Sequence, residues 1–201
     1  YLDDGIGVFE RIFDDLLVSD APDLAVHGRW PLVRFFGDHV AVIGIDSTRP
    51  NPPIRRSSGR VPEAQLDGLR TVLADPRLAG KFVFVMTHYA PRLSSGKPDT
   101  KEHGLENADD LLEVCSAIEW GALLHGHVHK CYRVQVPEMK IPLCGAGSTT
   151  MRGREGLWIY DIEDGASFVT RGRFEDGRYM LDETTREPLM EPPPRAPRPP
   201  T

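Results

Sequence analysis

Two apolar segments, each leading directly into histidine, constrain the fold of this chain more than any other feature. Lys81 to Thr87 (KFVFVMT) is followed by His88, and Trp120 to Leu124 leads into His125-Gly126-His127 and then His129. Short runs that are this apolar indicate strands buried on both faces, as in a sheet covered by other layers. Because α/β sheets bind ligands at the carboxyl ends of their strands, we expect these histidines at one cleft.

The spacing of His127 and His129 suggests what the cleft binds. In an extended chain, residues separated by one position project to the same side, and Gly126 lets the backbone turn closely. Imidazole is the commonest protein ligand for zinc, iron and related ions. A single histidine in a strand is more often structural, but three of the seven histidines follow two buried strands. This placement favours a metal site made by His88, His127 and His129.

The remaining sequence alternates helical and extended patterns. Helices are expected behind Asp3 and Asp4 as far as Ala21-Pro22, from Pro62 to about Asp75, and over the apolar positions between 111 and 118. The first of them carries apolar residues at helical spacing and is expected to dock on the domain. Extended runs are expected at 31–36, 39–45, 132–136, 141–144, 157–162 and 166–174. A tight reversal at Gly37-Asp38 would join the first two. This order predicts an α/β fold with a second sheet.

Two loops and a tail lie between or after these elements. Residues 48–59, which include Arg55 and Arg56, read as a surface loop whose arginines are solvated. The polar stretch from His88 to about Gly104 has a length typical of lids and binding loops. Pro188 to Thr201 is half proline. We therefore expect one domain over residues 1–187 and a polyproline-type tail over 188–201.

Composition excludes several functional classes. The sequence has 24 Lys and Arg against 30 Asp and Glu, a net charge of −6, which gives no broad attraction to nucleic acid or anionic lipid. No apolar run approaches the roughly 20 residues that span a bilayer, so we expect a soluble protein with no membrane partner. Three cysteines without a CxxC pair fit reduced thiols in the cytoplasm.

Several motifs together resemble one known family. GHVH (126–129) after an apolar strand and THYAP (87–91) resemble the last two motifs of the calcineurin-like metallophosphoesterase superfamily. HGLEN (103–107), GIDST (44–48) and CGAGSTT (144–150) are similar to its bacterial cyclic-nucleotide-phosphodiesterase-like branch. The resemblance covers residues 40 to 165 of the sequence.

This resemblance implies a fold, a reaction and a cofactor. The fold would be a four-layer α/β/β/α sandwich, and the reaction hydrolysis of a phosphoester, with phosphodiesters favoured, by hydroxide held between two Mn, Fe or Zn ions. His88 and His127 would bind one ion and His129 the other. The substrate would be a small, possibly nucleotide-like phosphoester.

The chain also departs from the family pattern. The earlier motifs, D-x-H, G-D-x-x-D and G-N-H-D/E, do not occur in it, so it resembles the C-terminal part of the domain. The other metal ligands and the histidine that protonates the leaving group would lie upstream of Tyr1, which leaves no catalytic residue in this chain. We expect such an upstream segment to lie along the central strands.

Weaker candidates surround the histidines. His103 and Asn107, before the third helix, would contact the phosphate or base of a substrate, or instead be a solvated histidine and a helix cap. Tyr89 would stack on a nucleobase or pack locally. Asp46 is more typical of turn chemistry than of a site, and Cys131 of a small buried apolar residue than of a ligand.

Two alternatives to a two-metal hydrolase remain open. A chain without half of the ligands would serve as a non-catalytic binding or assembly subunit. Three histidines alone would at most support a mononuclear zinc hydrolase. A homo-oligomer is compatible with each of these.

Overall fold

A computed structural model describes residues 5–51, 57–163 and 165–191, and all structural statements below concern these residues. The α-helices are α1 (Gly5–Ile12), α2 (Glu63–Leu73) and α3 (Ala108–Cys115), with short 3-10 turns η1 (Pro22–Leu24) and η2 (Pro76–Leu78). The strands are β1 (Leu32–Phe36), β2 (Val40–Gly44), β3 (Phe82–Thr87), β4 (Gly121–His125), β5 (Tyr132–Val134), β6 (Leu143–Gly145), β7 (Leu157–Glu163), β8 (Ala166–Glu175) and β9 (Arg178–Met190).

The larger sheet has the order β1-β2-β3-β4-β6-β5. Its four inner strands run parallel, and β1 and β5 pair antiparallel at the two edges. The expected reversal between β1 and β2 is confirmed, with Gly37 at φ 58°. As predicted, β3 is buried except at Met86, because both faces of the sheet are covered. The carboxyl ends of β2, β3, β4 and β6 therefore meet at one edge of the sheet.

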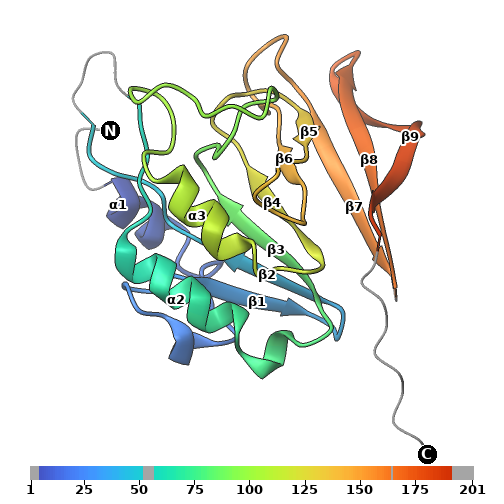
Figure 1. Ribbon diagram of the computed structural model, residues 1–201. Helices are drawn as coiled ribbons and strands as arrows, with labels where there is room; N and C mark the ends of the chain where they lie inside the picture. Colours follow the sequence, from blue (N-terminus) through green and yellow to red (C-terminus); the bar gives the residue numbers. More distant parts are fainter. Residues whose placement is uncertain (1–4, 52–56, 164, 192–201) are drawn as a thin grey trace, which may run out of the picture.

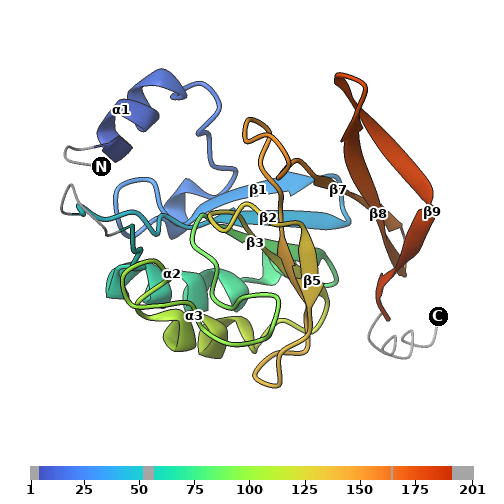
Figure 2. The same cartoon turned by 90° about the horizontal axis from the view of Figure 1, so that it is seen from above.

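Helices α2 and α3 cover one face of this sheet and the second sheet packs on the other, while α1 lies apart from α2 and α3 (Figures 1 and 2). On the helical side, Leu66 and Leu69 of α2 and Leu111 of α3 are fully buried in the main core. On the other side, the rings of Phe84 and Tyr160 lie 5.2 Å apart between the two sheets. Each fully buried side chain of this size stabilises the fold by roughly 1.5–3 kcal/mol. The predicted α/β class with a second sheet is confirmed.

The second sheet has the order β7-β8-β9, and its outer face carries charged side chains that pair with one another. There the Arg186 guanidinium lies 3.7 Å from the centre of the Phe168 ring and pairs with Asp161 at 3.6 Å. No helix within residues 5–51, 57–163 and 165–191 covers this face. The described chain thus forms three of the four layers that the resemblance implies.

Helix α1 differs from its prediction. It ends at Ile12 instead of near Ala21, and Ile12 and Leu16 are 62% and 65% exposed. The expected docking through its apolar side is wrong, because polar contacts orient the helix. The Trp30 indole donates to Glu10 at 3.0 Å, and Arg29 pairs with Asp14 at 2.8 Å.

Strand β9 was not predicted from the sequence. Residues 178–187 are mostly polar and resemble a loop, but they pair along most of β8. The strand continues through Pro188 and Leu189, whose side chain is only 6% exposed, to Met190. Three residues that the sequence assigns to the tail thus belong to the sheet. Residues 192–201 of that expected tail lie outside the described residues.

The central strands leave no free edge beside the histidines. β3 pairs with β2 and β4, and β4 pairs with β3 and β6. The expectation that an upstream segment lies along these strands is wrong, since both of their sides are hydrogen-bonded already. In this sheet only β1 and β5 have free edges within the described chain.

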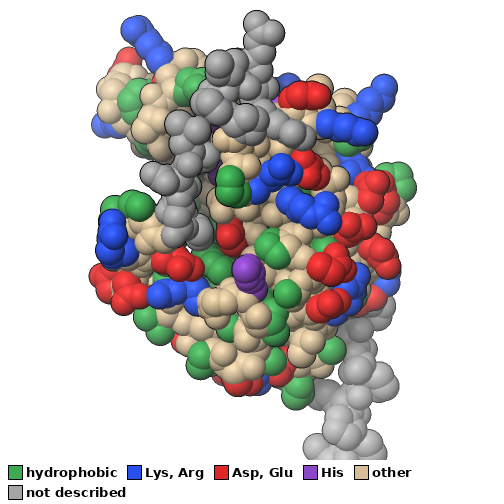
Figure 3. Space-filling model, turned by 90° about the vertical axis from the view of Figure 1, so that its left-hand side faces the viewer, with side chains coloured by type: hydrophobic (Ala, Val, Ile, Leu, Met, Phe, Trp, Pro, Cys, Tyr) green, Lys and Arg blue, Asp and Glu red, His purple; other side chains and the backbone are tan. Residues whose placement is uncertain are grey.

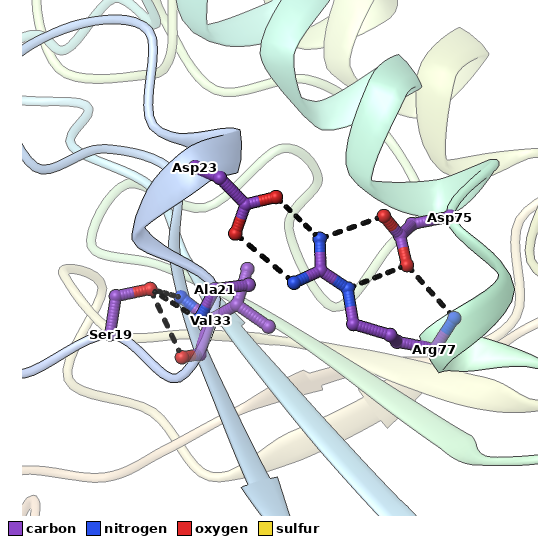
Figure 4. A network of polar contacts seen from close by, with 6 residues as sticks. All are labelled: Ser19, Ala21, Asp23, Val33, Asp75 and Arg77. Atoms are coloured by element: carbon purple, nitrogen blue, oxygen red, sulfur yellow. Dashed lines mark hydrogen bonds and ion pairs between the residues drawn. The ribbon is translucent and has the colours of Figure 1, made fainter.

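Polar contacts tie the short connections to the domain (Figure 4). Arg77 pairs with Asp23 at 2.8 Å and with Asp75 at 2.8 Å, which joins η1 to η2. Hydrogen bonds from Arg77 lower the pKa of Asp75 to about 2. Ser19 Oγ accepts from the amides of Ala21 and Val33.

Acidic and basic side chains alternate over the face seen in Figure 3. Among the described residues, no helix has the length and apolar character needed to cross a membrane.

Candidate functional site

The histidines gather at the carboxyl edge of the large sheet. β3 ends at Thr87 and β4 at His125, and these two residues are register partners. The chain beyond each strand enters the same region, where the ring centroids of His88 and His127 lie 5.3 Å apart. This shared edge and the convergence of His88 with His127 are as expected from the sequence.

The backbone from Gly126 to His129 is not extended. His127 and His129 have φ values of 65° and 48°, and the Val128 amide donates to the Gly126 carbonyl at 2.8 Å. The prediction that alternation points both side chains to one side is therefore wrong, because the chain turns directly after β4. Left-handed conformations cost a non-glycine residue about 1–2 kcal/mol each. Strain of this kind concentrates at functional sites.

His127 is held by contacts on several sides. Its Nε2 lies 2.8 Å from the carbonyl oxygen of His103. A carbonyl only accepts, so His127 donates from Nε2 and carries its lone pair on Nδ1. The rings of His103 and Tyr89 lie 4.1 Å and 4.3 Å from the His127 ring. Burial, followed by the neighbouring His103 and His88, lowers the pKa of His127 to about 4. The ring is neutral at pH 7.

His88 is neutral for the same main reason. Burial and then the charge of His129 lower the pKa of His88, although the residue remains partly exposed. That influence places His129 in the neighbourhood of His88.

The donor chemistry of this group fits a transition-metal ion, since such ions take neutral imidazole. The number of donors falls short. Within the parts of the chain that the structure describes, no three His, Cys, Asp or Glu side chains are arranged to hold a metal ion.

The loop before α3 positions His103. Asp99 Oδ2 lies 2.5 Å from His103 Nδ1, and Asp99 Oδ1 accepts from the Thr100 amide at 2.7 Å. Burial acts to raise the pKa of Asp99, but hydrogen bonds from His103 and Thr100 outweigh it and lower the pKa. Gly104 makes the turn possible, because a Cβ there would lie 2.9 Å from Asp99 Cβ. The Asp99 carboxylate thus holds His103 in place, and the carbonyl of His103 in turn orients His127.

The three candidates for substrate contact have different surroundings. His103 has 47% of its side chain exposed at the mouth of the site. Tyr89 is 2% exposed, and its ring packs against the backbone of Gly59, where a Cβ would lie 2.2 Å from the ring. Tyr89 therefore packs locally. Asn107 is buried, and its amide both accepts from and donates to the backbone of Val61. Asn107 stands at the N-cap position of α3, as expected, but its side chain makes no capping hydrogen bond.

His125 is a buried polar residue that the sequence analysis passed over as part of the strand. It is 4% exposed, its ring lies 5.3 Å from that of Tyr132, and its Nε2 has no hydrogen-bond partner. Burial lowers its pKa to about 4. The available signal was its place as the last residue of an apolar run.

Other sequence candidates have structural roles. The Asp46 carboxylate accepts from the amide and the hydroxyl of Thr48, which confirms the expected turn chemistry. Cys131 is half-buried with its thiol near the Leu157 carbonyl, and all three cysteines are free. Arg55 and Arg56 lie outside the described residues.

Similarity to known proteins is confined to solved structures. No family profile and no curated protein matches the sequence. The chain is similar to a solved structure of a putative 5'-nucleotidase from Staphylococcus aureus in complex with alpha-ketoglutarate, at 15% identity and a TM-score of 0.40. That likeness covers 79% of this chain and only 29% of the other. Vps29 from Entamoeba histolytica complexed with zinc is similar at 15% identity and a TM-score of 0.33, over 74% of this chain and 98% of that one. At these scores neither likeness carries an argument about activity.

Proposed function

We propose that this chain is part of a metal-dependent phosphoester hydrolase of the calcineurin-like class, with phosphodiesters as the favoured substrates. The observation that carries the proposal is the pair His88 and His127. Two neutral imidazoles, 5.3 Å apart between ring centres, lie at the ligand-binding edge of a parallel sheet. The remaining metal ligands would come from outside the described residues.

In this proposal each residue has a defined part. His127 would ligate through Nδ1, because its Nε2 is committed to the His103 carbonyl. His88 would join it on the same ion, and His129 would serve a second. Bound there, two such ions would activate water for attack on phosphorus and offset the charge of the phosphoryl oxygens. His103, exposed beside His127, would contact the substrate.

The test compares His127→Ala with His39→Ala in the complete protein. His39 is an exposed histidine next to the amino end of β2, at the opposite edge of the sheet. We expect His127→Ala to lose bound metal and at least 100-fold of its turnover of bis-nitrophenyl phosphate, because removing a ligand displaces the ion. His39→Ala should change neither. Turnover of His127→Ala within a few-fold of the parent would overturn the proposal.

A non-catalytic binding subunit is the second candidate, and the exposed apolar side of α1 favours it. Ile12, at the end of α1, and Leu16, in the turn that follows, are exposed, while the polar side of the helix is already engaged. This candidate predicts no hydrolysis of any phosphoester even when metal is bound. A mononuclear zinc hydrolase predicts one ion per chain, which metal analysis distinguishes from two.

A further inference from the structure

The loop that joins β6 to β7 and the end of β8 line an open surface cavity that the proposed hydrolytic site does not use. The cavity has a volume of about 660 Å³, within the range of small-molecule sites. It is lined by Thr149, Thr150, Arg152, Gly153, Glu155 and Phe174. We infer that it is a subsite for the planar heterocyclic base of a nucleotide-type phosphoester. This inference rests on the proposed function and specifies its substrate class.

The loop is built to hold its shape. Ser148, which is 8% exposed, accepts at Oγ from the amides of Thr150 and Met151 at 3.2 Å and 3.0 Å. Its own amide donates to the Arg154 carbonyl at 2.8 Å. At Gly147 a Cβ would lie 2.7 Å from the Gly156 backbone, so the two ends of the loop touch. The cavity is therefore formed before any ligand arrives.

Phe174, on β8, supplies an aromatic face beside this preformed loop. The residue is 42% exposed on the part of β8 that continues beyond the pairing of Gly172 with Leu157, where β7 begins. Its ring lies 5.1 Å from that of Tyr179, whose hydroxyl lies 3.3 Å from the Ser148 carbonyl oxygen and donates to it. An exposed ring that is anchored in this way is a platform for stacking a base.

The polar groups around the ring complement a nucleotide. Glu155 offers a carboxylate to the amino group of a base, and Arg152 offers a guanidinium to a phosphoryl oxygen. Neither residue makes an ion pair within the described chain. A purely apolar ligand would leave both charges unused.

The two ends of the loop that lines the cavity contact the segment that carries His127 and His129. Gly145, the last residue of β6, pairs with His125, and the Ala146 amide donates to the His125 carbonyl at 2.9 Å. Cys131, two residues beyond His129, packs on Gly156 at the far end of the loop. The β6–β7 loop and the loop after β3 lie at the same end of the molecule (Figure 1). A base on Phe174 would therefore lie at the same end of the molecule as His88 and His127.

The test is binding of adenosine 5'-monophosphate to the complete protein, measured by calorimetry. Phe174→Ala should weaken binding roughly tenfold or more, the effect of losing one stacked base. Phe36→Ala removes a ring that is 58% exposed at the end of β1 and should change nothing. Inorganic phosphate, which has no base, should bind both variants and the parent equally.

Arg152→Gln provides a second variant that removes no packing. It should weaken binding of the monophosphate and leave binding of adenosine unchanged. Unaltered nucleotide affinity in both Phe174→Ala and Arg152→Gln would overturn the subsite, even if His127→Ala still lost metal. Nucleotide binding that depends on Phe174, together with unchanged metal content and turnover in His127→Ala, would instead support the subsite and overturn the proposed hydrolase.

Discussion

At the scale of single residues, the orientation of His127 depends on a chain of three groups. The Asp99 carboxylate is hydrogen-bonded to the His103 ring, and the carbonyl oxygen of His103 accepts a hydrogen bond from Nε2 of His127. Partners of this kind select the tautomer of a metal-binding histidine and raise its basicity. The free lone pair on Nδ1 thus depends on a residue 28 positions earlier in the chain.

Asp99→Asn is expected to weaken metal binding by roughly 10- to 100-fold, because loss of an outer partner loosens the histidine that ligates. Titration of the protein with zinc measures this directly. Asp67→Asn, which breaks only an exposed pair with Arg70 on α2, is the matched control. Equal zinc affinity in the parent and in both variants would show that Asp99 has no part in the site.

The buried His125 predicts a pH dependence of stability. Its pKa is lowered from 6.5 to about 4, so the unfolded chain binds more protons between these values. Stability is fully present above pH 6.5 and falls as the pH drops towards 4, by on the order of 3 kcal/mol from this residue. His125→Gln should flatten this fall.

Urea unfolding of metal-stripped protein at pH 7 and pH 5 provides the measurement, with His27→Gln as control. His127, whose pKa is also about 4, contributes in the same direction, so a double change at 125 and 127 should flatten the fall further. The same loss of stability between pH 7 and pH 5 in all variants would contradict this assignment.

At the scale of elements, the local sequence pattern predicted those strands whose own apolar residues bury them. β3, β4 and the β1–β2 hairpin were predictable because continuous apolar runs and a Gly-Asp turn mark them. β9 was not, since its residues are polar and only pairing with β8 makes it a strand. The left-handed turn at His127 and His129 was equally unpredictable. The sequence GHVH is compatible with an extended strand, and nothing in it marks a histidine with positive φ.

Gly121 and Gly126, two glycines beside the site, differ in the space that they leave for a side chain. A Cβ at Gly121 would lie 2.1 Å from the Val83 carbonyl oxygen, a backbone atom that cannot move aside. At Gly126 the nearest atom would be His88 Nδ1 at 3.7 Å, an ordinary contact. The close turn expected to need Gly126 is thus less demanding than the start of β4.

Gly121→Ala should lower the free energy of unfolding by about 1–3 kcal/mol, the usual cost of overpacking. Gly126→Ala should change it by less than about 1 kcal/mol. Denaturant melts of both variants give the comparison. A smaller loss for Gly121→Ala than for Gly126→Ala would mean that β3 and β4 are further apart than described.

For the whole molecule, the second sheet is held to the first by a separate apolar cluster. Phe82, Phe84 and Ala122 from the large sheet meet Val169 and Leu189 from the small one. Leu189 belongs to the last strand, so the carboxyl end of the described chain joins the two sheets.

Leu189→Ala is expected to lower the free energy of unfolding by about 2–5 kcal/mol, because it leaves a cavity between the sheets. Leu181→Ala is a control on the same strand, since Leu181 is 47% exposed and should lose less than about 0.5 kcal/mol. The two losses are compared by urea unfolding. Equal losses in the two variants would mean that residues 188–190 belong to the tail expected from the sequence and not to β9.

The pairing of β3 with β2 and β4 also bears on how the protein acquires its site. His88 and His127 become neighbours only after strands from distant parts of the chain have crossed over and paired in parallel. Non-local pairing of this kind is slow, because the entropy of closing long loops is lost before contacts compensate for it. Collapsed folding intermediates should therefore lack the histidine cluster, and recovery of zinc affinity during refolding would time the completion of the sheet.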